Sequence, residues 1–178
     1  MSGIILCRSK YGASAKYAEW LSQETGFRVI DTKKANVNEV AKYDNIVLGG
    51  GVYAASVSGI SFLRKNYGAL KGRNIYVFCC GVAPDNDEEM LGILKERNLS
   101  GELADIPFFY YRGVWDLDSM NFADKAMCKL LMKSLEKKDP AEVKQWDRPL
   151  LEVKDKKADW TDKKYLTSLI ELIRSKGE

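Results

Sequence analysis

Short apolar segments alternate with helical patterns along most of this chain, and that alternation constrains its fold more than any other feature. The segments cover residues 3–8, 27–31, 45–49, 74–81 and 106–113. Apolar runs of this length are typical of strands buried on both faces of a sheet. Strands that alternate with helices require right-handed crossovers, which place helices on both faces of a parallel sheet. We therefore expect a three-layer, doubly wound α/β fold with a five-stranded parallel sheet.

Helices are expected between these strands, where apolar residues recur at helical spacing. The expected ranges are 13–25, one or two turns within 36–41, then 56–67, 85–97 and a last helix at about 161–175. Gly26 ends the first helix. Residues 137–159 show no clear element, and we expect them to pack irregularly over the surface. A chain of 178 residues is long enough for one full core, so a single domain over 1–178 is predicted.

Composition excludes several classes of function. The chain contains no histidine, which rules out Ser-His-Asp and Cys-His catalysis within it. Its net charge of +3 is too small for a dedicated nucleic-acid binder. The cysteines Cys7, Cys79, Cys80 and Cys128 form no Cys-x-x-Cys pair, and the first three lie in strand-like runs typical of buried thiols. With no signal peptide and no apolar run of the ~20 residues that span a bilayer, a reducing, cytoplasmic location is expected.

The loop after the first expected strand has the chemistry of an anion site. It reads Ser-Lys-Tyr-Gly-Ala-Ser and leads into a helix, whose N-terminal amides and dipole favour a phosphate. Ser9 and Ser14 offer hydroxyl groups, Gly12 allows a tight turn, and Lys10 adds a positive charge. Neither the Walker pattern nor Gly-x-Gly-x-x-Gly is present. The alternative is an ordinary serine helix cap, with Lys10 pointing to solvent.

Three further loops follow expected strands, and ligands of open parallel sheets bind at the carboxyl ends of strands. Residues 49–51 are glycines, which suggests close approach by something flat or bulky, and Tyr53 offers an aromatic ring for stacking on it. Gly81 lies in a loop that can present backbone amides, and Trp115 can form a second wall. The alternatives are a flexible turn with a surface tyrosine, a proline-containing turn and a core tryptophan.

Together these loops resemble those of the flavodoxin-like family. The family's phosphate loop, Ser/Thr-x-Thr-Gly-x-Ser/Thr, is matched by Ser9, Gly12 and Ser14, with Tyr11 in place of the middle threonine. The resemblance implies the sheet order 2-1-3-4-5 known for flavodoxin itself, with FMN as cofactor at the switch point. It also implies that residues 9–14 bind the FMN phosphate and that residues 52–54 lie on the isoalloxazine ring. The cofactor-binding residues that it predicts are Ser9, Lys10, Tyr11, Gly12, Ala13, Ser14, Gly51, Val52, Tyr53, Ala54, Gly81 and Trp115.

One branch of this family is more similar still. Residues 124–133, Asp-Lys-Ala-Met-Cys-Lys-Leu-Leu-Met-Lys, resemble a late helix of proteins similar to menaquinone-dependent protoporphyrinogen oxidase, and Asp159-Trp160 also fits. That helix carries an apolar stripe beside a basic stripe. It either packs on the core with a solvated lysine face, or touches an anionic membrane surface or an acidic partner. The apolar stripe is Met127, Leu130, Leu131 and Leu135, and the basic stripe is Lys125, Lys129, Lys133 and Lys137.

The expected function is that of a cytoplasmic FMN-dependent oxidoreductase. The flavin carries the chemistry, so no catalytic side chain and no metal are predicted. The partner is expected to be a small molecule or a redox protein, with peripheral membrane or quinone contact left open and no nucleic acid. One alternative is a soluble one-electron carrier, although carriers are usually acidic and commonly have glycine at the position of Ala54 to allow a peptide flip. The other is a binding module that kept the fold and lost the cofactor. A receiver-like domain is disfavoured, because the strand ends carry Ser, Gly and Cys rather than acidic clusters.

Overall fold

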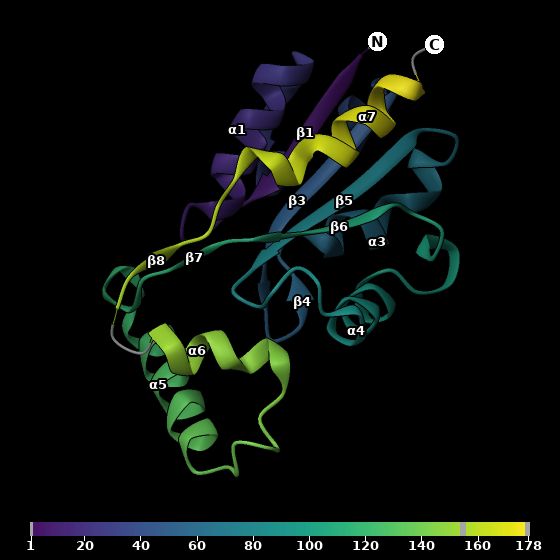
Figure 1. Ribbon diagram of the computed structural model, residues 1–178. Coiled ribbons are helices and arrows are strands. Elements are labelled where there is room, and N and C mark those ends of the chain that lie inside the picture. Colours follow the sequence, from purple (N-terminus) through teal and green to yellow (C-terminus); the bar gives the residue numbers. More distant parts are fainter. Residues whose placement is uncertain (1, 154–155, 177–178) are drawn as a thin grey trace.

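Five parallel strands form the middle layer of the computed structural model, which describes residues 2–153 and 156–176 (Figure 1). The strands lie in the spatial order β2-β1-β3-β5-β6. Counted along the chain, these parallel strands have the order 2-1-3-4-5, so the predicted doubly wound fold is confirmed. The bounds are β1 Gly3–Arg8, β2 Arg28–Asp31, β3 Asn45–Tyr53, β5 Asn74–Gly81 and β6 Phe108–Arg112.

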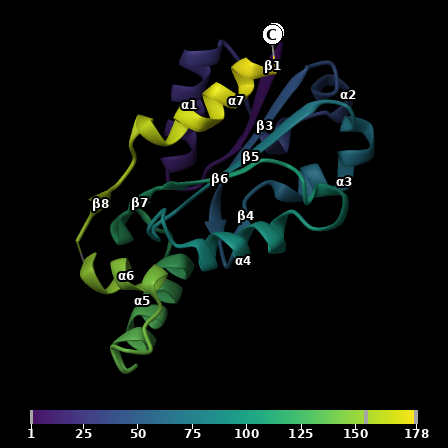
Figure 2. The ribbon, with the colours of Figure 1, turned by 45° about the vertical axis from the view of Figure 1, so that its right-hand side comes forward.

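Successive residues of each central strand face opposite sides of the sheet, which gives the fold two cores. In β1, Ile4 and Leu6 join one core, while Ile5 and Cys7 join the other. Figures 1 and 2 show the first core covered by α2, α3 and α4, and the second covered by α1 and α7. Burial on both faces explains why the strands are continuous apolar runs in the sequence. The helices are α1 Ala13–Thr25, α2 Val37–Val40, α3 Ile60–Leu70, α4 Glu88–Asn98 and α7 Thr167–Ser175.

Side-chain caps set helix starts that apolar spacing does not fix. The Asp87 carboxylate accepts a hydrogen bond from the Met90 amide at 2.9 Å, so α4 begins at Glu88. A 3₁₀ turn capped by Asp162 precedes α7. Both helices therefore begin later than expected. The 3₁₀ turns cover Thr32–Lys34, Gly101–Leu103, Leu117–Ser119, Gln145–Asp147 and Lys163–Leu166.

β3 continues beyond its predicted end and turns back on itself. The strand runs through the three glycines to Tyr53, and β4, Ser56–Val57, pairs with it in antiparallel orientation. The expectation of a helix over residues 56–67 is therefore wrong at its start, because α3 begins only at Ile60. The pairing of β4 with β3 is a tertiary contact, and helical spacing in the sequence gives no sign of it.

Close contacts within the protein require two of the glycines of β3. A Cβ on Gly49 would lie 2.1 Å from the ring of Phe78, and a Cβ on Gly50 would lie 2.1 Å from the backbone carbonyl oxygen of Ser58. At Gly51 the nearest heavy atom would be 3.9 Å away, which is ordinary contact distance. The groups that approach the first two glycines therefore belong to the protein, and Gly51 is the glycine left to face a ligand.

A helical lobe, residues 116–153, is inserted between the sheet and α7. Two short antiparallel strands, β7 Val114–Trp115 and β8 Ala158–Asp159, form its base. The lobe contains α5 Phe122–Glu136 and α6 Arg148–Val153 and projects beyond the sheet (Figures 1 and 2). The expectation that residues 137–159 lack regular structure is wrong for α6 and β8, because contacts with distant parts of the chain stabilise both elements. Positions 154–155 lie outside the described residues. The buried core of this region is Trp115, Leu117, Met132, Leu135 and Leu150.

α5 packs through one side only. Of its predicted apolar stripe, Leu135 is buried, whereas Met127, Leu130 and Leu131 are exposed. The interpretation of α5 as a core-packed helix with a solvated lysine face therefore holds for Leu135 and fails for the other three residues of the stripe. Within the described ranges, no helix, α5 included, is long and apolar enough to cross a membrane.

Candidate functional site

Loops at the carboxyl ends of β1, β3, β5 and β6 enclose a cavity of about 580 Å³. This volume lies within the range of small-molecule sites. The helical lobe closes one side of the cavity with Met120, Asp124 and Cys128. Of the predicted site residues, Gly12 and Ala54 do not line the cavity. The others do: Ser9, Lys10, Tyr11, Ala13, Ser14, Gly51, Val52, Tyr53, Gly81 and Trp115.

The first turn of α1 presents backbone amides to this cavity. Gly12 occupies the N-cap position with φ of 94°, a conformation that favours glycine, and no described side chain caps the helix. The first turn also contains no acidic residue. Ser9 Oγ accepts a 3.1 Å hydrogen bond from the Gly12 amide, which shapes the loop but leaves the first helical amides without a side-chain acceptor. The loop is therefore not an ordinary serine cap, and its amides and dipole suit an anion.

Asp124, on α5, joins the first two predicted loops. Its carboxylate accepts hydrogen bonds from the hydroxyl groups of Tyr11 and Tyr53 and pairs with the ammonium of Lys10. That ammonium also lies 5.0 Å from the centre of the Tyr53 ring. Tyr53 is 39% exposed but fixed through its hydroxyl, and Lys10 is paired with a carboxylate rather than free in solvent. The ring of Tyr53 is therefore a positioned wall and not part of a flexible turn.

Asp124 is a site residue that was not predicted from the sequence, although its place on α5 carries a signal for it. Asn121 caps the helix by accepting a 2.9 Å hydrogen bond from the Asp124 amide, which places the carboxylate in the first turn. Asp124 is only 5% exposed, on the buried side of the helix. The hydrogen bonds from Lys10, Tyr11 and Tyr53 lower its pKa to about 2, so the carboxylate is charged at neutral pH. An acid on the buried face of an amphipathic helix needs such partners.

Apolar groups form the rest of the cavity wall. Trp115 is 4% exposed and belongs to the core of the lobe, yet it also lines the cavity, so both of its predicted interpretations apply. Val82 and Met120 lie beside it in that cluster and line the same cavity. The carbonyl of Gly81 accepts a 2.7 Å hydrogen bond from the Gly113 amide, which holds the loops after β5 and β6 together. The cavity thus combines backbone amides with a flat, apolar wall.

The cysteines offer no activated nucleophile. Burial raises the pKa of Cys7 to about 11 and that of Cys80 to about 12, and Cys79 is raised by burial as well. Cys128, which lines the cavity, is half-buried, and its pKa is raised by burial and by the charge of Asp124. All four are free thiols, and at neutral pH they stay protonated.

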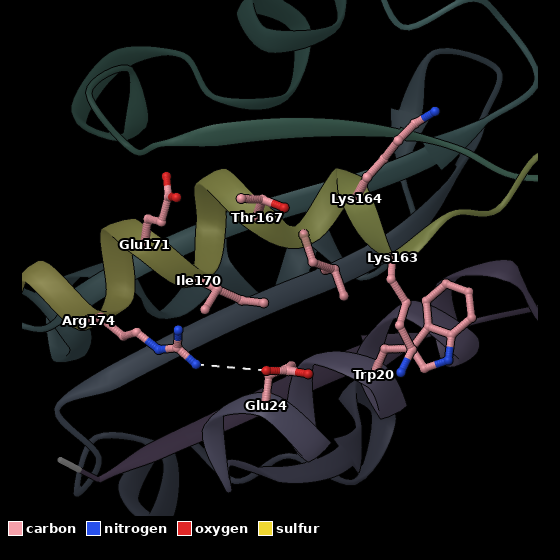
Figure 3. Close-up of a pocket in the computed structure, with 9 residues that line it drawn as sticks. Trp20, Glu24, Lys163, Lys164, Thr167, Ile170, Glu171 and Arg174 are labelled. Atoms are coloured by element: carbon pink, nitrogen blue, oxygen red, sulfur yellow. Dashed lines mark ion pairs between the residues drawn. The ribbon is translucent and has the colours of Figure 1, made fainter.

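A second hollow lies on the face covered by α1 and α7, away from these loops (Figure 3). It has a volume of about 350 Å³ and is lined mostly by charged side chains. Arg174 and Glu24 form a 3.7 Å ion pair across it, and Lys163 lies over the ring of Trp20. The hollow lies away from the carboxyl ends of the strands, and two of its charged side chains already form an ion pair with each other, so we do not treat it as a second candidate site.

The fold and the cavity define the class of this protein: a doubly wound α/β protein with a cavity at the carboxyl ends of its strands, next to a helix N-terminus that no side chain caps among the described residues. The chain belongs to the flavodoxin domain family, whose model matches residues 4–142.

Solved structures to which this chain is similar include a flavodoxin from the domain Archaea, with 14% identity, a TM-score of 0.42 and coverage of 74% of this chain and 93% of that one. A Megasphaera elsdenii flavodoxin has 16% identity, a TM-score of 0.42 and coverage of 62% and 82%. The Trp repressor binding protein from Bacillus subtilis has 12% identity, a TM-score of 0.46 and coverage of 64% and 83%. No curated protein matches the chain.

Proposed function

We propose that this protein binds FMN and acts as a flavin-dependent oxidoreductase. The observation that carries the proposal is one cavity that combines uncapped helix amides with aromatic walls, in a chain of the flavodoxin domain family. The amides suit a phosphate, and the rings of Tyr53 and Trp115 suit a flat ring system. A bound flavin supplies electron and hydride transfer, while the protein holds it and tunes it.

The phosphate would be held by neutral groups. The ammonium of Lys10 is already paired with Asp124, so it adds little charge for a second anion. The amides of the first turn of α1 and the hydroxyl groups of Ser9 and Ser14 can donate to it, and Gly12 gives the loop its conformation. Neutral donors and a helix dipole are sufficient to bind a phosphate in a preformed loop.

The ring would be held between walls whose positions are set by the protein. Asp124 fixes the hydroxyl of Tyr53, and the core of the helical lobe fixes Trp115. With the side chains around the cavity held in this way, little ordering would be required on binding. No side chain is assigned a proton-transfer role.

Two glycine variants test this function. Gly12 and Gly26 lie at opposite ends of α1, both with positive φ and both with open space where a Cβ would be added. Alanine is strained at both positions, and more so at Gly12, whose φ of 94° and ψ of −31° lie outside the αL region that Gly26 adopts. We expect Gly12→Ala to weaken FMN binding about tenfold or more, because it distorts the phosphate loop, and Gly26→Ala to leave it unchanged. Binding is measured by the quenching of FMN fluorescence on titration with the purified protein.

A colourless protein that quenches no FMN fluorescence would refute the proposal and favour a binding module without cofactor. Equal losses of affinity in the two variants would show that the effect comes from destabilised folding, and the phosphate loop would then lose its assigned role.

The narrower function, oxidation of a protoporphyrinogen-type substrate with transfer of electrons to a quinone, is supported by the sequence likeness of residues 124–133. We propose it as the first substrate class to test, with a small molecule or a redox protein as the partner. The test is anaerobic mixing of the FMN-loaded protein with protoporphyrinogen, followed by addition of a menaquinone analogue. Bleaching of the flavin absorbance and its return with the quinone is the expected result. An unchanged spectrum would exclude this substrate.

A further inference from the structure

The side of α5 that faces away from the lobe core carries a concentration of exposed apolar side chains. Phe122 is 90% exposed, Leu130 is 70% exposed, and Met127 and Leu131 are close to half exposed. These are four of the seven large hydrophobic residues that are exposed in the described part of the chain. Exposed apolar side chains gathered on one helix are typical of an interaction site, whereas single ones are common on any surface.

Helical spacing places these side chains in neighbouring rows. Met127 lies three residues before Leu130 and four before Leu131, so these three side chains are neighbours on one side of the helix. Phe122 is the first residue of α5 and lies about 80° from Leu130 around the helix axis, beside the lysines. The buried residues Met132 and Leu135 lie on the opposite side, where they pack into the lobe core. Exposed apolar side chains therefore occur from the first residue of α5 to Leu131.

A row of lysines borders the apolar rows. Lys129, Lys133 and Lys137 are spaced four apart, and in the described part of the chain none of them forms an ion pair. Lys125 is paired with Asp118 at 3.0 Å and belongs to the edge of the row. Apolar side chains beside lysines are the arrangement of a helix that lies in a membrane interface.

We propose that this exposed side of α5 binds the surface of a bilayer that contains anionic lipids. The apolar rows enter the boundary between headgroups and acyl chains, and the lysines contact the lipid phosphates. A second copy of the chain is a poorer occupant, because joining two such faces brings two lysine rows together without matching acids. A convex helix on a projecting lobe also suits an extended surface better than a peptide (Figures 1 and 2).

This surface and the candidate FMN cavity lie on different sides of one helix. Asp124 and Cys128 of α5 line the cavity, whereas Leu130 faces away from the lobe core. Membrane binding therefore needs no cofactor and can be tested without FMN. Failure to bind lipid would leave the proposed FMN site standing, and failure to bind FMN would leave the proposed membrane surface standing.

The test is flotation of the purified full chain, without FMN, with vesicles of phosphatidylcholine alone or mixed equally with phosphatidylglycerol. We expect binding to the mixed vesicles that falls at high salt, and at least tenfold weaker binding to phosphatidylcholine alone. Phe122→Ser combined with Leu130→Ser should reduce binding at least tenfold. The matched control is Ile93→Ser, which removes a side chain that is 48% exposed on α4.

Charge is tested by Lys129→Gln combined with Lys133→Gln, for which we expect about a fivefold loss per lysine on the mixed vesicles. No flotation with mixed vesicles, or equal loss in the Ile93 control, would overturn the proposal. So would sedimentation equilibrium showing a dimer that the Phe122 and Leu130 substitutions dissociate in the absence of lipid, since a second copy would then cover this face. Circular dichroism checks that each variant is folded.

Discussion

The carboxylate of Asp124 connects the two loops of the candidate site to the helical lobe. It holds Lys10, Tyr11 and Tyr53, and its pKa is lowered from 3.8 to about 2 by those contacts. A lowered pKa means that the ionised carboxylate stabilises the folded state at neutral pH. The same contacts orient Tyr53, so a change at Asp124 alters both stability and the shape of the cavity.

Asp124→Asn is expected to change how stability depends on acid. In the wild type the contribution of this carboxylate is complete above about pH 4 and is lost as the pH falls towards 2, because the unfolded chain binds the proton first. The variant has no carboxylate to protonate at this position, so its free energy of unfolding should fall less steeply between pH 4 and 2. The difference in slope corresponds to the uptake of up to about one proton on unfolding. Urea unfolding at a series of pH values measures the slopes. Asp105→Asn, at an exposed site, is the control for removal of a carboxylate. The prediction would be contradicted if the free energy of unfolding of Asp124→Asn depended on pH in the same way as that of the wild type.

Cys128 provides a reporter for the cavity. It lines the cavity and is half-buried, whereas Cys7, Cys79 and Cys80 are buried with raised pKa values. We expect a maleimide to label Cys128 alone in the folded protein and all four thiols in urea. Saturating FMN should slow the labelling of Cys128 severalfold by covering it. Mass spectrometry of the labelled peptides distinguishes the sites, and a rate unaffected by bound FMN would place the flavin elsewhere.

The β3–β4 hairpin stores backbone strain beside the cavity. Its two turn residues, Ala54 and Ala55, have φ of 47° and 60°, although turns with two positive φ values favour asparagine and glycine. Ala54 is exposed, so its side chain gains little from packing in return. Strain of this kind gathers at functional sites.

Ala54→Gly should therefore stabilise the protein. We expect its free energy of unfolding to rise by about 1 kcal/mol, because glycine adopts this conformation without the Cβ clash. Ala126→Gly, at an exposed position within α5, should lower the free energy of unfolding by about 1 kcal/mol, because glycine has a lower helix propensity than alanine. Guanidinium unfolding of both variants measures the difference. Destabilisation by both changes would mean that the turn is not strained.

The cavity lies where the sheet meets the helical lobe, so a bound cofactor would tie two parts of the protein together. FMN at 100 times its dissociation constant should raise the free energy of unfolding by about 2.7 kcal/mol, if only the folded state binds it. Urea curves with and without FMN measure this shift. The same concentration of FMN should shift Gly12→Ala less, because its affinity is lower. Superimposable wild-type curves would show that FMN does not bind the folded state.

Local patterns in the sequence predicted the sheet because each strand is buried on both faces and carries its own apolar run. The run at residues 3–8 and the helix at residues 13–25 match β1 and α1 of the structure. The order of the strands came from resemblance to a known family, and the structure confirms it. The positions of the loops at one edge of the sheet follow from that order.

Contacts between distant residues decided the rest. Tyr11 and Tyr53 reach Asp124 across 113 and 71 residues, and β4 forms only because β3 lies beside it. Periodicity describes how a segment repeats, and it carries no information on which distant segment will meet it. The amphipathic character of α5 could be predicted from residues 122–136. Which side of the helix lies against the lobe core depended on how the chain packs, and that packing leaves Leu130 exposed.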